Sequence, residues 1–360
     1  MEAKVSRSSN LELLRIIAML VIVAHHYVVN SGLMTLIKAN PENMNSIMLL
    51  IFGWGGKTAI NCFVLITGYF MCKKQITVEK YMKLFTQVLF YNIVIGAVFV
   101  IAGYQQLNVK FLITALFPFN NVGNSGSFTT SYLFFFLLIP YINILIKNMS
   151  IKEYKVLLCL SLFMYCLLPS IGFKTAFSSV IWFSVIYLIG AYIRLFIDAK
   201  TVNYKVMGKL ALVFLLISWV SIILMIKVGA YLGKFAPYWL VADENKILAL
   251  LLAISTFLFF LKLPLPNSSF INTISAAAFG VLLIHANSAA MRTWLWKDLL
   301  NNVGQYGSQW MMIHAILSVV GIYTVCSIIE ICRIKYLENI IVDFSTKYIK
   351  KITDKLAVCF

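Results

Sequence analysis

An arginine and two adjacent histidines lie within one apolar stretch near the N-terminus, RIIAMLVIVAHHYVV at residues 15–29. On a helix, the spacing from Arg15 to His26 makes almost three turns, so the two share a face about 16 Å apart along the axis. A guanidinium binds phosphate or carboxylate groups, and a neutral imidazole can take a proton from a hydroxyl. The pair therefore suits an anionic ligand that is held at Arg15 and reacts near His26. His25 points about 100° away from His26, and we interpret it as structural.

Both members of this pair also have a simpler interpretation. An arginine about one turn inside a membrane helix can extend its charge to the interface, whatever the function of the protein. A histidine at membrane depth can serve only as a hydrogen-bond partner of a neighbouring helix. The spacing alone leaves both interpretations of Arg15 open, while His26 is our candidate for the reactive group.

Three further polar side chains fall at membrane depth, where ionisable groups are costly and mark functional sites. Lys57 and Asn61 are four residues apart, hence on one helix face, and His285 lies at a depth comparable to that of His26. Any of the three could stabilise a developing oxyanion, although Lys57 could instead pair with a carbonyl or another polar group. The sequence contains no HExxH, GxSxG or Walker motif and no CxxC pair, so we predict no metal site.

The composition identifies the environment that must position these residues. The chain has 360 residues, of which 61% are hydrophobic and 12% charged, and its mean hydropathy is +0.88. Soluble domains average about 25% charged residues, so we predict an all-α, polytopic membrane protein with about ten transmembrane helices. The predicted spans are residues 11–29, 46–70, 82–103, 129–147, 155–171, 178–197, 207–226, 246–262, 270–290 and 308–332.

The charge distribution predicts the orientation. The formal net charge is +17, from 30 Lys and Arg against 13 Asp and Glu. With the N-terminus in the cytoplasm, 21 of the 30 basic residues lie inside and the other nine lie outside, which places both termini in the cytoplasm. The basic excess therefore indicates loops that face cytoplasm and the anionic lipid bilayer, and we expect no nucleic-acid partner.

The chain divides into a transmembrane domain over residues 1–332 and a basic tail over residues 333–360. Apolar residues recur at helical spacing in the tail, with lysines between them. This pattern predicts a basic amphipathic helix on the membrane surface, or alternatively a short solvated helix.

Four segments resemble one family. NLELLRIIAMLVIVAHHY at the N-terminus resembles the opening of the acyltransferase-3 family of integral membrane O-acyltransferases, in which an arginine, ten residues and a histidine recur. INCFVLITGYF (60–70), IWFSVIYLIGAYIRL (181–195) and FGVLLIHANSAAMRTWLW (279–296) resemble further family segments, in the same order. The resemblance extends over nearly the whole chain, and it is to the type that O-acetylates bacterial surface polysaccharide.

The resemblance implies transfer of an acetyl group from cytoplasmic acetyl-CoA to a hydroxyl of an extracytoplasmic glycan: a capsule, an exopolysaccharide or a cell-wall polysaccharide. It implies a multi-pass protein of the bacterial plasma membrane and possible separate glycan-synthesis partners. The family's catalytic base corresponds to His26, and its donor-binding arginine corresponds to Arg15. A basic pair that is commonly arginine in the family corresponds to Lys80 and Lys83, and Lys lacks the bidentate phosphate geometry of Arg.

A transporter or flippase of a glycan or lipid-linked sugar is the alternative function. It would explain the many spans, the polar residues at membrane depth and the aromatic residues predicted outside, which lie at 231–240 and at Trp294 and Trp296. It would not explain the Arg15–His26 spacing beside the basic inner loop at residues 72–83.

Overall fold

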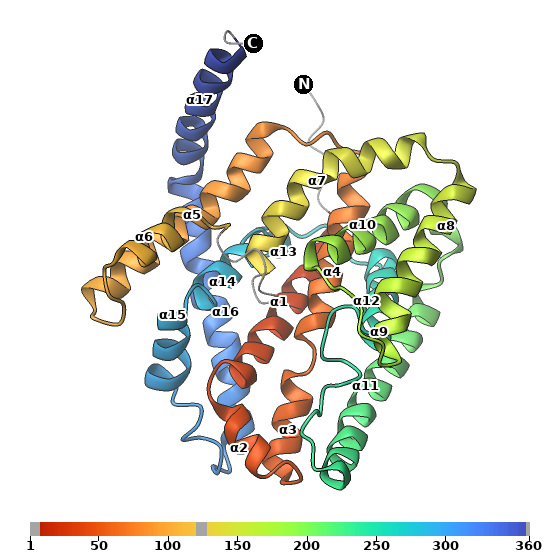
Figure 1. The fold of residues 1–360 in the computed structure, drawn as a ribbon, viewed down its shortest axis with the longest axis vertical. Helices are drawn as coiled ribbons and strands as arrows, with labels where there is room; N and C mark the ends of the chain where they lie inside the picture. The colour runs from red at the N-terminus through yellow and green to blue at the C-terminus, as the bar shows by residue number, and fades with distance from the viewer. Residues whose placement is uncertain (1–7, 120–127, 358–360) are drawn as a thin grey trace.

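The computed structural model describes the backbone of residues 8–119 and 128–357, and the side chains of these ranges up to residue 347 apart from Ala199. Within these ranges the protein is a bundle of helices without strands (Figure 1). The helices are α1 Ser9–Val29, α2 Leu33–Ala39, α3 Met44–Gly53, α4 Gly56–Met71, α5 Val78–Ile101, α6 Val109–Leu116, α7 Phe128–Asn148, α8 Ile151–Leu162, η1 Phe163–Leu167, α9 Leu168–Ser170, α10 Ser179–Phe196, η2 Ala199–Thr201, α11 Tyr204–Leu232, α12 Ile247–Lys262, α13 Ser269–Ala276, α14 Ala278–His285, α15 Ala289–Thr293, η3 Trp294–Leu299, α16 Met311–Tyr336 and α17 Glu338–Ala357.

The helices confirm the all-α membrane class. Seven described helical segments are long and apolar enough to cross a bilayer, and a bent pair, Ser269–His285 with Ala289–Leu299, makes an eighth candidate. The predicted spans 155–171 and 246–262 are helical but do not meet the same test. α12 has 16 residues, or about 24 Å at 1.5 Å per residue, which is less than the usual hydrocarbon thickness of about 30 Å. The count of ten therefore stays a prediction.

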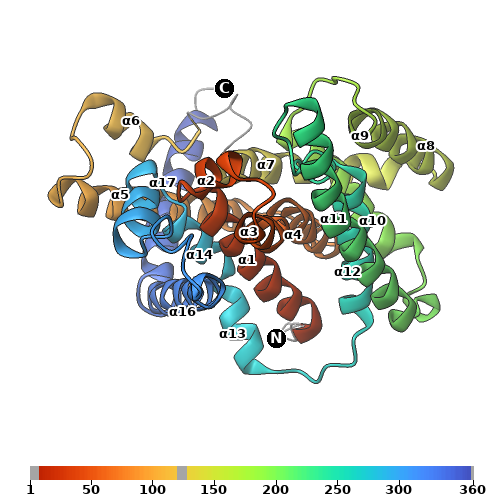
Figure 2. The ribbon, with the colours of Figure 1, turned by 90° about the horizontal axis from the view of Figure 1, so that it is seen from below.

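Two ends of the bundle are distinguishable in Figure 1. The connections from α4 to α5 and from α7 to α8 lie at its upper end, whereas α2 and the end of α11 lie at its lower end. The upper connections belong to the basic loops that we expect in the cytoplasm. Seen from below, α1, α3 and α4 occupy the middle of the molecule, between the α5, α14 and α16 side and the α10, α11 and α12 side (Figure 2).

α4 and α10 cross at close range. A Cβ added to Gly68 would lie 2.5 Å from the Tyr187 carbonyl oxygen, and one added to Gly190 would lie 2.5 Å from the Leu65 carbonyl oxygen. Small residues let two membrane helices approach at backbone distance and gain van der Waals contact. The crossing holds the helix that carries Lys57 and Asn61.

The second span is interrupted at Trp54 and Gly55, between α3 and α4. The interruption frees backbone groups, and His25 Nδ1 lies 2.6 Å from the carbonyl oxygen of Gly53, the last residue of α3. A Cβ on Gly56 would lie 2.6 Å from the His25 ring. Contact with this break agrees with the structural interpretation of His25.

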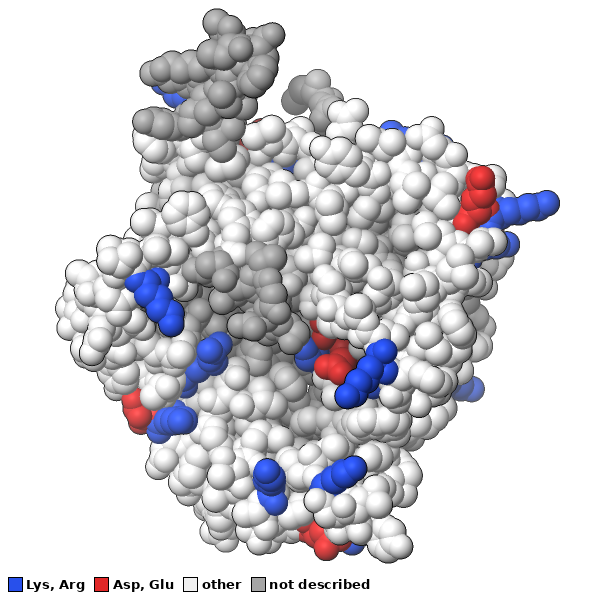
Figure 3. Space-filling model, in the orientation of Figure 1, with Lys and Arg blue, Asp and Glu red and all other residues white. Residues whose placement is uncertain are grey.

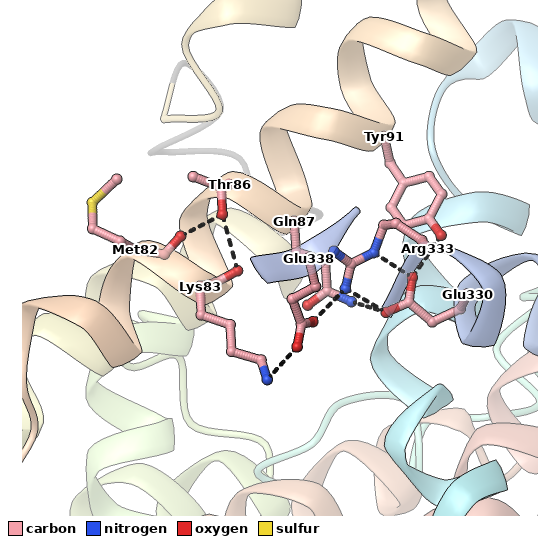
Figure 4. A network of polar contacts seen from close by, with 8 residues as sticks. All are labelled: Met82, Lys83, Thr86, Gln87, Tyr91, Glu330, Arg333 and Glu338. Carbon is pink, nitrogen blue, oxygen red and sulfur yellow. Dashed lines mark hydrogen bonds and ion pairs between the residues drawn. The ribbon is translucent and has the colours of Figure 1, made fainter. Parts of the chain in front are cut away.

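A buried charge network joins α5, α16 and α17 (Figure 4). Glu330 accepts hydrogen bonds from Gln87 at 2.8 Å and Tyr91 at 2.6 Å, and both of its oxygens bind Arg333 at 2.8 Å. Arg333 also binds Glu338 at 2.8 Å. The first residue of α17 is thereby tied to the bundle, while the helix itself extends beyond it (Figure 1). The predicted boundary between residues 332 and 333 falls within α16, which continues to Tyr336.

Candidate active site

Two predicted site residues from opposite ends of the sequence meet in the bundle. His26 lies near the end of α1, and His285 is the last residue of α14. His26 Nδ1 is 2.9 Å from His285 Nε2, and the ring centroids are 5.1 Å apart. His285 is completely buried, whereas His26 is partly exposed. The pair therefore presents only one ring to a ligand.

The hydrogen bonds of the pair determine which nitrogen carries each proton. His285 Nδ1 lies 2.6 Å from the Val281 carbonyl oxygen, which can only accept, so Nδ1 is the donor. In a neutral His285 ring, Nε2 is then an acceptor, and His26 Nδ1 must donate to it. The unprotonated nitrogen of a neutral His26 is consequently Nε2, the atom that a general base needs.

His26 lines a cavity of about 900 Å³. One side of the cavity follows the α1 face through Ile22, His26 and Asn30. The other described lining residues come from α4, α5, α6, the start of α7, α14 and α15, and they are mostly apolar or amide- and hydroxyl-bearing: Ile60, Val88, Asn92, Gly96, Phe99, Gln105, Asn108, Lys110, Phe111, Thr114, Ala115, Pro118, Phe128, Thr129, Thr130, Leu282, Leu283, Ala286, Asn287, Ser288, Ala289, Ala290 and Arg292. Amide and hydroxyl groups on an apolar wall suit a sugar with many hydroxyls.

A break in the chain directly after His285 opens this cavity. The helices before and after the break meet at 93°, and Ala286, Asn287 and Ser288 of the connection all line the cavity. Ser288 then begins the next helix, accepting a hydrogen bond from the Met291 amide at 3.1 Å. The bend turns Arg292 into the cavity wall.

Arg292 was not among the site residues predicted from the sequence. An arginine at the outer part of a predicted span is the available signal. Its place beside His26 depends on the bend, which the apolar pattern of residues 270–290 does not predict. Asn30, Asn92 and Lys110 were missed for the same reason, since none belongs to a recognisable motif.

Lys57 and Asn61 lie together, as expected from their spacing, but both bind Glu244 in the connection before α12. Lys57 Nζ is 2.9 Å from the Glu244 carboxylate, and Asn61 Nδ2 donates to the Glu244 carbonyl oxygen at 2.7 Å. Asn61 Oδ1 accepts from Trp182 Nε1 at 3.0 Å. Neither residue is among the described residues that line the cavity.

Arg15 lies on the same helix as His26 but outside the described cavity lining. Its Nη1 binds both oxygens of Glu12 at 3.0 Å, and Glu12 also accepts from Ser275. The Arg15 side chain remains 28% exposed.

Lys80 and Lys83 lie at the start of α5. Lys80 Nζ donates to the Gln75 carbonyl oxygen at 2.7 Å, and Lys83 Nζ pairs with Glu338 at 2.6 Å while its side chain stays 56% exposed. No described hydrogen bond or ion pair joins either lysine to Arg15.

The helical membrane bundle and the hydrogen-bonded histidine pair define a membrane protein with a candidate acid–base site. The model of the acyltransferase-3 family, described as an acyltransferase domain, matches residues 8–331. This protein therefore belongs to that family and is an acyltransferase, which decides between the two functions considered from the sequence. No curated protein and no solved structure matches the chain.

Proposed function

We propose that this acyltransferase moves an acetyl group from cytoplasmic acetyl-CoA to a hydroxyl of an extracytoplasmic glycan, with His26 as the general base. The observation that carries the proposal is the hydrogen-bonded series from Val281 through His285 to His26, beside a cavity of about 900 Å³. It supports a His26 whose Nε2 is ready to accept a proton. The lining includes Asn30, directly after α1, and Phe99, near the end of α5, and the basic-loop distribution assigns these helix ends to the outside.

The reaction is a direct acyl transfer. The acceptor hydroxyl gives its proton to His26 Nε2, and its oxygen attacks the thioester carbonyl carbon. The carbon–sulfur bond then breaks, and the CoA thiolate leaves and takes the proton from His26 Nε2. In the His26 imidazolium that forms between these steps, Nδ1 keeps its proton and continues to donate it to His285 Nε2. The pair therefore needs no rearrangement.

The donor enters from the opposite end. Arg15 contacts the CoA phosphates, helped by Lys80 and Lys83. The acyl arm reaches the cavity past Tyr132, which hydrogen-bonds Thr67 at 3.0 Å and lies 6.0 Å from the Phe279 ring. Lys83 already pairs with Glu338. A CoA phosphate that binds Lys83 therefore replaces the Glu338 carboxylate as its partner.

The other predicted site residues act as supports in this scheme. His285 orients His26, since both of its nitrogens are occupied by Val281 and His26. Lys57 and Asn61 hold the connection that contains Glu244 against α4. The separate glycan-synthesis machinery supplies the acceptor.

The test is acetyl transfer in membranes that contain the protein, with radiolabelled acetyl-CoA and surface glycan from the cells that make it. We expect label in the glycan with the wild-type protein and a loss of about 10²–10⁴-fold in His26→Ala, the usual contribution of a general base. His314→Gln is the matched control, because His314 binds Tyr27 at 2.9 Å outside the cavity. A His26→Ala protein that inserts and keeps full activity overturns the proposal.

A further inference from the structure

Arg292 is a half-buried cation without a partner in the described part of the chain. It lines the cavity, and it belongs to none of the described ion pairs and to no described side-chain hydrogen bond. The nearest acidic residue along the sequence, Asp298, lies against the Tyr104 hydroxyl instead. A guanidinium that is partly removed from water gains most from a bound anion.

The rest of the cavity has the same sign of charge. Lys110 of α6 also lines it and is exposed. No described lining residue is acidic. Figure 3 shows Lys and Arg side chains bordering the hollowed middle of this face, with Asp and Glu side chains beside them on one border. A concave site whose described lining holds cations and no anions favours an acidic ligand.

We propose that the acceptor is an acidic glycan, and that Arg292, assisted by Lys110, binds a carboxylate or phosphate of the sugar chain beside the hydroxyl to be acylated. This inference rests on the proposed function and names its acceptor class. The amide groups of Asn30, Asn92 and Asn287 in the same cavity bind the neutral hydroxyls.

The proximity of Arg292 to His26 adds a reason for an acidic acceptor. Arg292 and His26 line the same cavity, so the Arg292 charge opposes the positive charge that His26 gains when it takes the acceptor proton. An anion bound to Arg292 cancels this opposition. An acidic acceptor thus both binds at Arg292 and removes a charge that disfavours the reaction.

A role for Arg292 only in stabilising the reaction oxyanion is the competing possibility. That role needs one donor close to the reacting carbon. It does not account for the second cation, Lys110, on another helix of the same wall. The two roles differ in the acceptors that they affect, so the experiment compares acceptors.

The experiment measures label transfer from radiolabelled acetyl-CoA to three preparations of one surface glycan: untreated, carboxyl-reduced and dephosphorylated. With the wild-type protein we expect one treatment to lower transfer about 10-fold or more, the usual effect of losing a hydrogen bond to a charged group. Carboxyl reduction identifies a carboxylate, and dephosphorylation identifies a phosphate. Equal transfer to all three overturns this inference but leaves the proposed function intact. No transfer to any preparation means that the proposed function itself fails.

The variants assign the effect to Arg292. Arg292→Gln should raise the KM for the untreated glycan about 10-fold, weaken the salt dependence of that KM and remove most of the difference between the preparations. Arg292→Lys should recover part of the loss. Lys297→Gln changes an exposed cation of η3 outside the described cavity lining and should behave as the wild type.

Three outcomes of the variants count against the inference. One is an Arg292→Gln variant with the wild-type KM, and another is an Arg292→Gln variant that lowers transfer to the untreated and treated glycans by the same factor, as an oxyanion role requires. Lys110→Gln provides a separate test, because Lys110 is exposed and its replacement leaves the fold intact. It should also raise the KM for untreated glycan and weaken its salt dependence, and an unchanged KM contradicts the role of Lys110.

Discussion

His26 Nδ1 lies 2.9 Å from Nε2 of His285, although the two residues are 259 positions apart in the chain. Because the Val281 carbonyl accepts from His285 Nδ1 at 2.6 Å, the contact determines the tautomer of His26 as well as its orientation. His285 itself is completely buried. It is therefore a positioning residue, and its effect on the reaction passes through His26.

Replacing His285 tests this role. His285→Leu removes the acceptor for His26 Nδ1, and we expect kcat to fall about 10- to 100-fold, the range typical of partners that orient a functional histidine. The KM values for acetyl-CoA and glycan should change little. His285→Gln, whose Oε1 can accept the same proton, should recover part of kcat. Equal losses in both variants, with raised KM values, would indicate a packing role only.

Arg15→Ala tests the donor end. Arg15 is the basic residue of α1 that we assign to the CoA phosphates. We therefore expect its loss to raise the KM for acetyl-CoA about 10-fold. The KM for the glycan should stay close to the wild-type value. Arg15→Lys should recover only part, because Lys lacks the bidentate geometry. Lys205→Ala, at the exposed start of α11, is the control. A rise in the glycan KM alone would contradict a donor role.

The Lys57–Glu244 pair should matter for stability. The Glu244 side chain is 4% exposed and the Lys57 side chain is 28% exposed. Lys57→Met therefore leaves the buried Glu244 carboxylate without its described ion-pair partner. We expect a loss of about 1–3 kcal/mol in the free energy of unfolding, measured in detergent. The double variant Lys57→Met/Glu244→Leu should lose less than the sum of the single variants. The Lys227–Glu42 pair, 66% and 51% exposed, is the matched control and should contribute about 0–1 kcal/mol. Strict additivity at Lys57 and Glu244 would show that the pair is not coupled.

Arg333 should hold the start of α17 against the bundle. Its side chain is 5% exposed and bridges two buried carboxylates, Glu330 and Glu338. Arg333→Met leaves both carboxylates without their shared cation, and we expect a loss of about 3–5 kcal/mol. Tryptic cleavage at the α17 lysines should accelerate with it. Lys83→Met removes a 56% exposed partner of Glu338 and should cost only about 0–1 kcal/mol. Similar effects of the two variants would contradict this assignment.

Much of the architecture was predictable because it depends on local pattern. Apolar segments of about 20 residues determine membrane helices wherever they occur, and helices occupy most of each of the ten predicted ranges. Arg15 and His26 share a face of α1 because helix periodicity is a property of the segment alone. The adjacency of Lys57 and Asn61 follows from the same rule.

The tertiary structure decided what lies opposite these residues. The pairing of His26 with His285, and that of Lys57 with Glu244, joins segments that are far apart in the sequence. The break after His285 is absent from the apolar pattern, yet it bends the chain by 93° and brings Arg292 to the cavity. Spacing along a helix determines the direction of a side chain, whereas its partner depends on how separate helices pack.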